Sequence, residues 1–135
     1  MALIQWKPEL SVKIRRIDEE HQRLIQLTND LDEAMGQGKS KAVMGTIVAE
    51  LARYTRTHFS YEQDLFAQHS YPDAPAHLAE HEIFVGEISR FAADFEAGRL
   101  GLSIQVMNFL SEWLTTHIKG TDRKYTDFFN QRGVN

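Results

Sequence analysis

The sequence contains no cysteine, and this absence removes several kinds of chemistry. Disulfide bonds, thiolate metal sites and cysteine nucleophiles are all excluded. Proline is also scarce, with only 3 in 135 residues. A chain of this length with few helix breakers and 42% hydrophobic residues is typical of a largely helical globular protein that buries its own core without covalent cross-links.

An excess of positive charge is lacking as well. The net charge is −4, and no cluster of Lys and Arg lies among aromatic residues, so a nucleic-acid partner is disfavoured. No apolar run approaches the roughly 18 residues of a membrane span. The first residues, MALIQWKPEL, do not resemble a signal peptide. We therefore expect a single domain over residues 1–135, located in the cytoplasm.

Apolar residues recur at helical spacing in four runs that are separated by turn signals. The expected helices cover residues 17–35, 40–66, 73–98 and 104–120, and the string YTDFF predicts a short further helix. The first 16 residues carry apolar and aromatic side chains around Pro8, and we expect them to pack on the helices as an irregular arm. This organisation predicts an all-α fold, namely an up-down-up-down four-helix bundle with an N-terminal arm and a short C-terminal helix.

Histidines stand at regular positions on the predicted helices. Five of the six fall where core-facing apolar residues also lie, and His69 is expected in a loop outside any site. His58 precedes Glu62 by four residues, and His77 precedes His81 by the same interval. Residues four apart lie on one helix face, so each pair can reach a common metal ion.

His117 and Asp122 are five residues apart, which does not suit an unbroken α-helix. At roughly 100° per residue, their side chains would point about 140° apart. Gly120 lies between them, and a residue without Cβ can end a helix and reverse the chain. We therefore expect a break at Gly120 that returns Asp122 to the side of His117.

Each of these signals is weak when taken alone. HxxxE patterns arise by chance, an isolated histidine is more often a core or surface residue, and paired histidines at this spacing also bind zinc. The combination is stronger, because five buried imidazoles without a metal would each need a hydrogen-bond partner and would repel one another once protonated.

The order and spacing of these residues resemble the hemerythrins, in particular the single-domain bacterial kind, from Trp6 to Phe129. Four strings stand at the family's relative positions: SVKIRRIDEEHQRL, HFSYEQ, YPDAPAHLAEHEIF and WLTTHIKGTDRKYTDFF. Three positions depart from the family pattern. Lys13 stands where the family often has Gly, Glu20 where Gln is common, and Gln63 where a second Glu follows the bridging one.

The resemblance implies a non-haem di-iron centre (Fe2+/Fe3+) with a bridging oxo or hydroxo group. The implied ligands are His77, His81 and His117 on one iron, His21 and His58 on the other, and Glu62 and Asp122 as bridges between them. Two six-coordinate ions offer about twelve positions, and these ligands together with the bridging oxygen leave one position open. The open position falls on the iron that has only two imidazoles.

The function implied by the resemblance is reversible binding of molecular oxygen, for storage, carriage or delivery, without enzymatic turnover. The ligand set agrees, because it lacks the Glu-x-x-His motifs of di-iron oxidases built on helix bundles. The family places apolar side chains around the open position, although each of them could equally be plain core. They correspond here to Leu24, Phe59, Trp113, Leu114 and Ile118.

Three other functions remain open at this stage. The same scaffold could act as a di-iron oxidase or peroxidase, or as a module that senses oxygen, nitric oxide or redox state. A metal-free interaction bundle is the third alternative. The sequence has no output domain after the bundle, which favours carriage or storage over sensing. An oxygen-consuming protein could receive the oxygen, but the sequence does not identify it.

Overall fold

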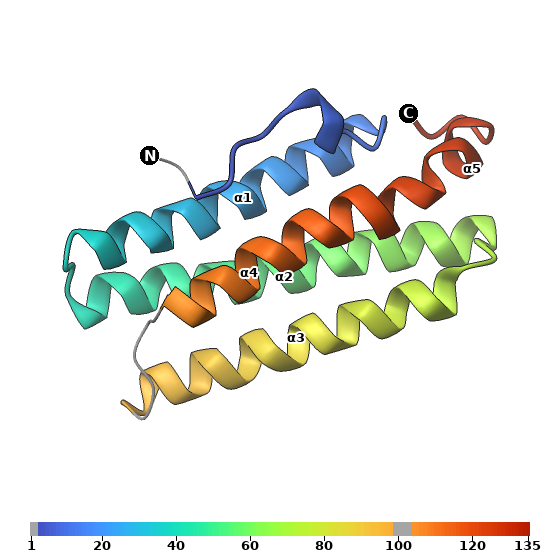
Figure 1. Ribbon diagram of the computed structural model, residues 1–135. Coiled ribbons are helices and arrows are strands. Elements are labelled where there is room, and N and C mark those ends of the chain that lie inside the picture. The colour runs from blue at the N-terminus through green and yellow to red at the C-terminus, as the bar shows by residue number, and fades with distance from the viewer. Residues whose placement is uncertain (1–2, 99–103) are drawn as a thin grey trace.

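The computed structural model describes residues 3–98 and 104–135 of the chain. Long helices run side by side and alternate in direction, and they form the predicted four-helix bundle (Figure 1). They are α1 (Arg15–Gly36), α2 (Lys41–His69), α3 (Ala74–Glu96) and α4 (Ile104–Thr116). Within these described ranges no helix is both long enough and apolar enough to cross a membrane.

The ends of the helices follow from local sequence. The Ser40 side chain caps α2 by accepting a hydrogen bond of 3.2 Å from the backbone N–H of Val43. Pro75 stands in the first turn of α3, where its missing N–H costs no helical bond. Gly98 follows the end of α3 with φ of +75°, a conformation that glycine adopts without strain. The predicted starts of these two helices are therefore confirmed to within a residue or two.

The N-terminal arm packs along α1, as predicted (Figure 1). Ile4 and Leu10 are buried, and the arm contains a short 3-10 helix, η1 (Pro8–Leu10). The Asn29 side chain accepts a hydrogen bond from the Ile4 backbone N–H (2.9 Å) and donates one to the Ile4 carbonyl (2.8 Å). These two bonds satisfy an otherwise irregular backbone and attach the arm to the bundle.

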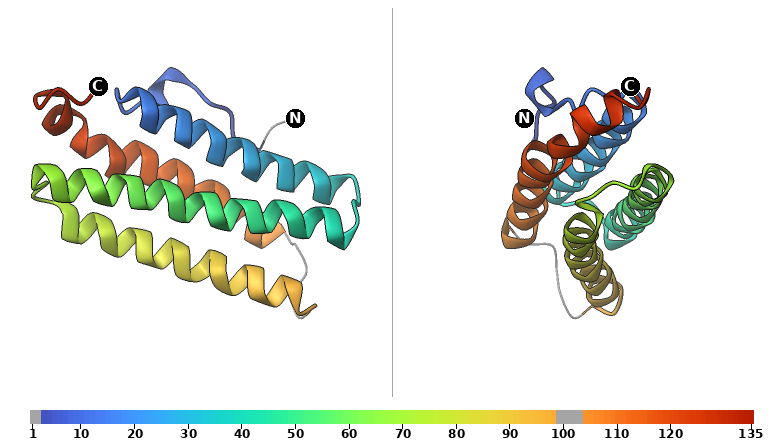
Figure 2. Two further views of the ribbon diagram at one scale, coloured as in Figure 1. Left: turned by 180° about the vertical axis from the view of Figure 1, so that it is seen from behind. Right: turned by 90° about the vertical axis from the view of Figure 1, so that its right-hand side faces the viewer.

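The prediction that the fourth helix ends near Gly120 is wrong. Beyond α4 the chain continues as a π-helical turn, η2 (His117–Thr121), then a 3-10 turn, η3 (Asp122–Tyr125), and then α5 (Thr126–Asn130). Seen end-on, this extension continues the line of α4 beside α1 (Figure 2). The backbone N–H of Asp122 donates to the carbonyl of His117, five residues earlier. A wider turn, and not a break, therefore absorbs the extra residue.

Substitution of Gly120 tests whether the turn between His117 and Asp122 needs a conformation that only glycine adopts easily. Gly120 lacks the positive φ of a chain reversal, and an added Cβ would meet no atom within 4 Å. We expect Gly120→Ala to raise the free energy of unfolding by about 0.5–1 kcal/mol, because alanine restricts the unfolded chain without strain in the folded one.

Gly38→Ala is the matched control, since Gly38 is equally open but has φ of +64°. This variant should lose about 1 kcal/mol, because L-residues are strained in that conformation. Urea unfolding measures both effects. A destabilised Gly120→Ala, similar to Gly38→Ala, would show that a glycine-specific conformation is required between His117 and Asp122.

Candidate metal centre

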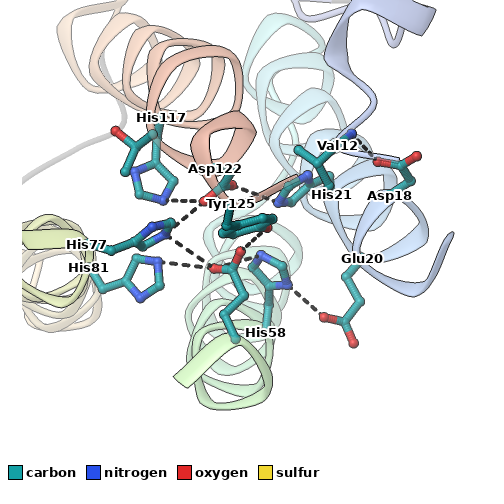
Figure 3. Close-up of polar contacts among 12 residues, drawn as sticks. Val12, Asp18, Glu20, His21, His58, His77, His81, His117, Asp122 and Tyr125 are labelled. Atoms are coloured by element: carbon teal, nitrogen blue, oxygen red, sulfur yellow. Dashed lines mark hydrogen bonds and ion pairs between the residues drawn. The ribbon is translucent and has the colours of Figure 1, made fainter. Parts of the chain in front are cut away.

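The side chains predicted as metal ligands converge in the middle of the bundle, where each is no more than 3% exposed (Figure 3). They come from all four long segments of the chain. The contributors are His21 from α1, His58 and Glu62 from α2, His77 and His81 from α3, and His117 and Asp122 from the turns that extend α4.

These side chains form two groups that share both carboxylates. In each group, one potential ligand atom per residue lies within 4.8 Å of all the others. The first group consists of Glu62, His77, His81, His117 and Asp122, and the second of His21, His58, Glu62 and Asp122. The arrangement thus has room for two ions, with three imidazoles around one position and two around the other.

The Asp122 carboxylate lies between the two groups. Its Oδ1 is 2.9 Å from Nε2 of His77 and 3.0 Å from Nε2 of His117, and its Oδ2 is 3.0 Å from Nε2 of His21. Each oxygen therefore faces imidazoles of a different group, which is the geometry required of a bridging ligand. The π-helical turn produces this placement, because its winding returns Asp122 to the face of His117.

Glu62 also faces both groups. Its Oε1 lies 3.1 Å from Nε2 of His81 and 3.5 Å from Nε2 of His58. Its Oε2 accepts a hydrogen bond of 2.5 Å from the Tyr125 hydroxyl. Burial raises the pKa of Tyr125 well above its ordinary value, so this hydroxyl stays protonated and remains a donor.

Most of the clustered polar atoms form no hydrogen bond with any described residue, although several Nε2 and carboxylate oxygen atoms lie at the ion-pair distances given above. The atoms without a hydrogen bond include both ring nitrogens of His21, His77 and His81, and both carboxylate oxygens of Asp122. Unpartnered buried polar atoms are costly, and a site built of imidazoles and carboxylates is a typical donor set for divalent transition metals. The cluster therefore fits a metal centre better than it fits a hydrogen-bonded core.

The electrostatics of the cluster also depend on the close approach of imidazole and carboxylate. Burial opposes the charged form of His117, but the Asp122 carboxylate outweighs burial and raises the pKa of His117 to about 9. Burial acts to raise the pKa of Asp122, yet His117 holds it well below its ordinary value. Without a metal, the Asp122 carboxylate thus retains a proton on His117, and metal binding at His117 must release that proton.

Sequence reasoning did not place two carboxylates behind the imidazoles, although it noted Glu20 as a departure from the family pattern. Glu20 Oε1 lies 2.7 Å from Nδ1 of His58. Glu80 Oε1 lies 3.0 Å from Nδ1 of His117 and also accepts a hydrogen bond from the Thr121 hydroxyl at 2.8 Å. Both glutamates directly precede a predicted ligand in the sequence. Adjacent residues point to different sides of a helix, so neither glutamate belongs to the face that carries the predicted ligands.

Two tyrosines close to the cluster differ in their contacts. Tyr125 is fully buried and donates its hydroxyl hydrogen bond to Glu62. Tyr61 instead packs its ring against the Arg16 guanidinium, with 3.9 Å to the ring centroid. The sixth histidine, His69, belongs to neither group of candidate ligands and is the last residue of α2, whereas we expected it in a loop.

The aromatic residues predicted around the open position border the group with three imidazoles. Phe59 stacks on His81 with ring centroids 3.7 Å apart, and Trp113 stacks on His117 at 4.3 Å. The Phe59 ring also lies 5.8 Å from that of His58 in the other group. The three aliphatic side chains of the predicted pocket are all buried in the core: Leu24, Leu114 and Ile118.

Comparison with known proteins agrees with this geometry. Residues 12–129 match the family model of the hemerythrin HHE cation binding domain. The chain belongs to the hemerythrin family. It is 35% identical to a bacteriohemerythrin of Stenotrophomonas maltophilia and 34% identical to one of Pseudomonas aeruginosa. Each alignment covers 94% of this chain and 82% of the relative.

Solved structures show the same likeness at the level of the fold. The crystal structure of a wild-type hemerythrin superposes with a TM-score of 0.89 and 27% identity, and the match covers 93% of this chain and 97% of that one. The resemblance to hemerythrins that the sequence pattern predicted is thereby confirmed. The buried cluster of histidines and carboxylates suits the metal site that the name of the family model describes.

Removal of metal should lower the melting temperature strongly, because the cluster would lose the partner of its buried polar atoms. An ion at a thousandfold its dissociation constant adds about 4 kcal/mol. At roughly 3 °C per kcal/mol for a domain of this size, chelation should lower the melting temperature by about 10 °C or more. Thermal unfolding followed by circular dichroism, with and without chelator, measures the shift.

Two histidine variants supply the controls for this experiment. His69→Gln lies outside both groups and should keep the full response to chelator, whereas His77→Gln should lose most of it. Equal melting of the metal-loaded and chelated parent protein would show that these residues do not share a metal.

Proposed function

We propose that this hemerythrin-family protein binds molecular oxygen reversibly at two iron ions joined by an oxo or hydroxo bridge. The observation that carries the proposal is the inequality of the two ligand groups around shared carboxylates, with three imidazoles in one and two in the other. With both ions six-coordinate, the group of His21 and His58 has the free position. The two irons, when bound, supply the electrons for oxygen binding and recover them on release.

The surrounding residues favour binding over turnover. The candidate ligands and their aliphatic neighbours are buried, so water and external acids are kept away from bound ligand. The hydroxyl of Tyr125 is engaged with Glu62, and its raised pKa makes it a poor proton donor to anything else. A site with few available protons favours release of intact oxygen over its reduction.

The ligand set supports the same choice. Five of the candidate ligands are imidazoles and only two are carboxylates. Di-iron oxidases on similar bundles surround their metals mostly with glutamate, and the added negative charge stabilises more highly oxidised iron. We therefore propose an oxygen-binding protein, not an oxidase, that stores, carries or delivers oxygen. Its cytoplasmic location stays a prediction from the sequence.

The proposal predicts both a stoichiometry and a reversible spectrum. We expect two irons per chain after native purification, because two groups of ligands share both bridges. The colourless reduced protein should gain a visible absorption band when oxygen is admitted and lose it when oxygen is removed. Metal analysis and anaerobic spectroscopy measure these quantities. A single iron or zinc per chain, or a spectrum that never reverses, would refute the proposal.

Two substitutions should separate oxygen protection from metal binding. Leu114 is buried one turn before His117 and is no candidate ligand, so Leu114→Ala should keep both irons. The lost side-chain volume should admit water and anions to the site, and the oxygenated protein should decay several-fold faster. Glu62→Ala removes a shared ligand, so iron content and oxygen binding should fall together.

Leu114→Ala and Glu62→Ala are compared by the number of irons per chain and by the lifetime of the oxygenated spectrum. Equal iron loss in both variants would mean that Leu114 supports the metal and not the oxygen pocket. An unchanged lifetime in Leu114→Ala would place the open position elsewhere.

A further inference from the structure

One imidazole in each ligand group has a glutamate behind it. Glu20 Oε1 lies 2.7 Å from Nδ1 of His58, and Glu80 Oε1 lies 3.0 Å from Nδ1 of His117. The remaining imidazoles, His21, His77 and His81, have no hydrogen-bond partner on Nδ1 within the described residues. Each ligand group therefore has one imidazole with a carboxylate behind it, namely His58 in the group with two imidazoles and His117 in the group with three.

The two glutamates differ in their surroundings. The Glu20 side chain is 10% exposed, while the Glu80 side chain is 42% exposed. The charge of Glu80 is therefore screened by water far more than that of Glu20. Of the two carboxylates, Glu20 has the stronger electrostatic influence on the imidazole that it contacts.

The Glu20 carboxylate is also held in place from its other side. Its Oε2 accepts a hydrogen bond of 3.1 Å from Nε of Arg16, and the Arg16 guanidinium lies over the Tyr61 ring at 3.9 Å from the centroid. Figure 3 shows the Glu20 side chain directed toward His58 from α1. Arg16 and Tyr61 thus fix the carboxylate, and the carboxylate fixes the ring.

We propose that Glu20 is a positioning residue for the iron bound by His21 and His58, and that its negative charge lowers the reduction potential of the di-iron centre. The inference rests on the proposed function for the identity of the metal. It extends that function by naming a residue outside the ligand set that adjusts how readily the oxygen-binding iron is oxidised.

Two physical effects support this role. A hydrogen bond from Nδ1–H to Glu20 selects the tautomer that leaves Nε2 of His58 free, and that nitrogen is the one facing Glu62 at 3.5 Å. The carboxylate also makes the imidazole a stronger electron donor, which stabilises Fe3+ relative to Fe2+. The first effect requires only a hydrogen-bond acceptor, whereas the second requires the charge.

Substitutions at Glu20 can separate the two effects. Glu20→Gln keeps an oxygen that accepts from Nδ1–H but removes the charge, so both irons should stay bound. At a fixed mediator potential, without oxygen, its ratio of reduced to oxidised protein should rise about tenfold above that of the parent. Glu20→Ala removes the acceptor as well, so iron affinity should fall by roughly 10- to 100-fold.

Glu19→Gln is the matched control on the same helix. Glu19 pairs with Arg15 four residues earlier at 3.3 Å, just as Glu20 pairs with Arg16, but its side chain is 63% exposed and contacts no candidate ligand. This variant removes the same charge one position away. It should keep the parent's iron content and its ratio of reduced to oxidised protein.

The measurements are iron per chain and anaerobic redox titration, neither of which depends on oxygen binding. A two-iron Glu20→Gln protein with the parent's ratio would overturn the role of Glu20 and leave the proposed function intact. An equal change in Glu19→Gln would also overturn it, because general surface charge would then suffice. A parent protein without two irons would refute the proposed function, and this inference with it.

Discussion

The interior of this protein depends on polar groups that the helices force together. Five imidazoles and two carboxylates occupy the middle of the bundle, and most of their nitrogen and oxygen atoms form no hydrogen bond with any described residue, although several lie at ion-pair distance from one another. Burial of such groups without partners opposes folding by several kcal/mol. Two bound metal ions would make the cluster's contribution to the free energy of folding favourable, since these atoms would become metal ligands. Metal binding at this cluster would therefore be coupled to folding.

The wider helical turn at His117–Thr121 is the second requirement of this arrangement. An α-helix would direct His117 and Asp122 to different faces, and a true helix end would leave Asp122 on a loop with its own freedom. The π-helical turn keeps Asp122 in a continuous helical segment, whose later residues Tyr125 and Phe129 are fully buried. The shared carboxylate is thus held by core packing on both sides, as a preorganised ligand should be.

The sequence was sufficient for the bundle, the family resemblance and the convergence of the candidate ligands, because spacing of three or four residues translates directly into a helix face. It was insufficient at His117–Asp122, where the same spacing of five suits either a break at Gly120 or a wider turn, and only backbone hydrogen bonds distinguish the two. It also failed to predict the contacts of Glu20 and Glu80, since these contacts join residues from different helices. Pairing across helices depends on how the helices are rotated against one another, which a single sequence does not encode locally.

The two ligand groups differ in the number of imidazoles and in the residues that surround them. Phe59 and Trp113 stack on imidazoles of the fuller group, which fixes those rings against apolar surface. The poorer group instead receives the buried carboxylate of Glu20 behind His58. If iron is bound as proposed, having one imidazole fewer makes the ion at His21 and His58 harder to oxidise, and the Glu20 charge behind His58 offsets this effect. That ion would then keep a position free for a ligand and still be readily oxidised.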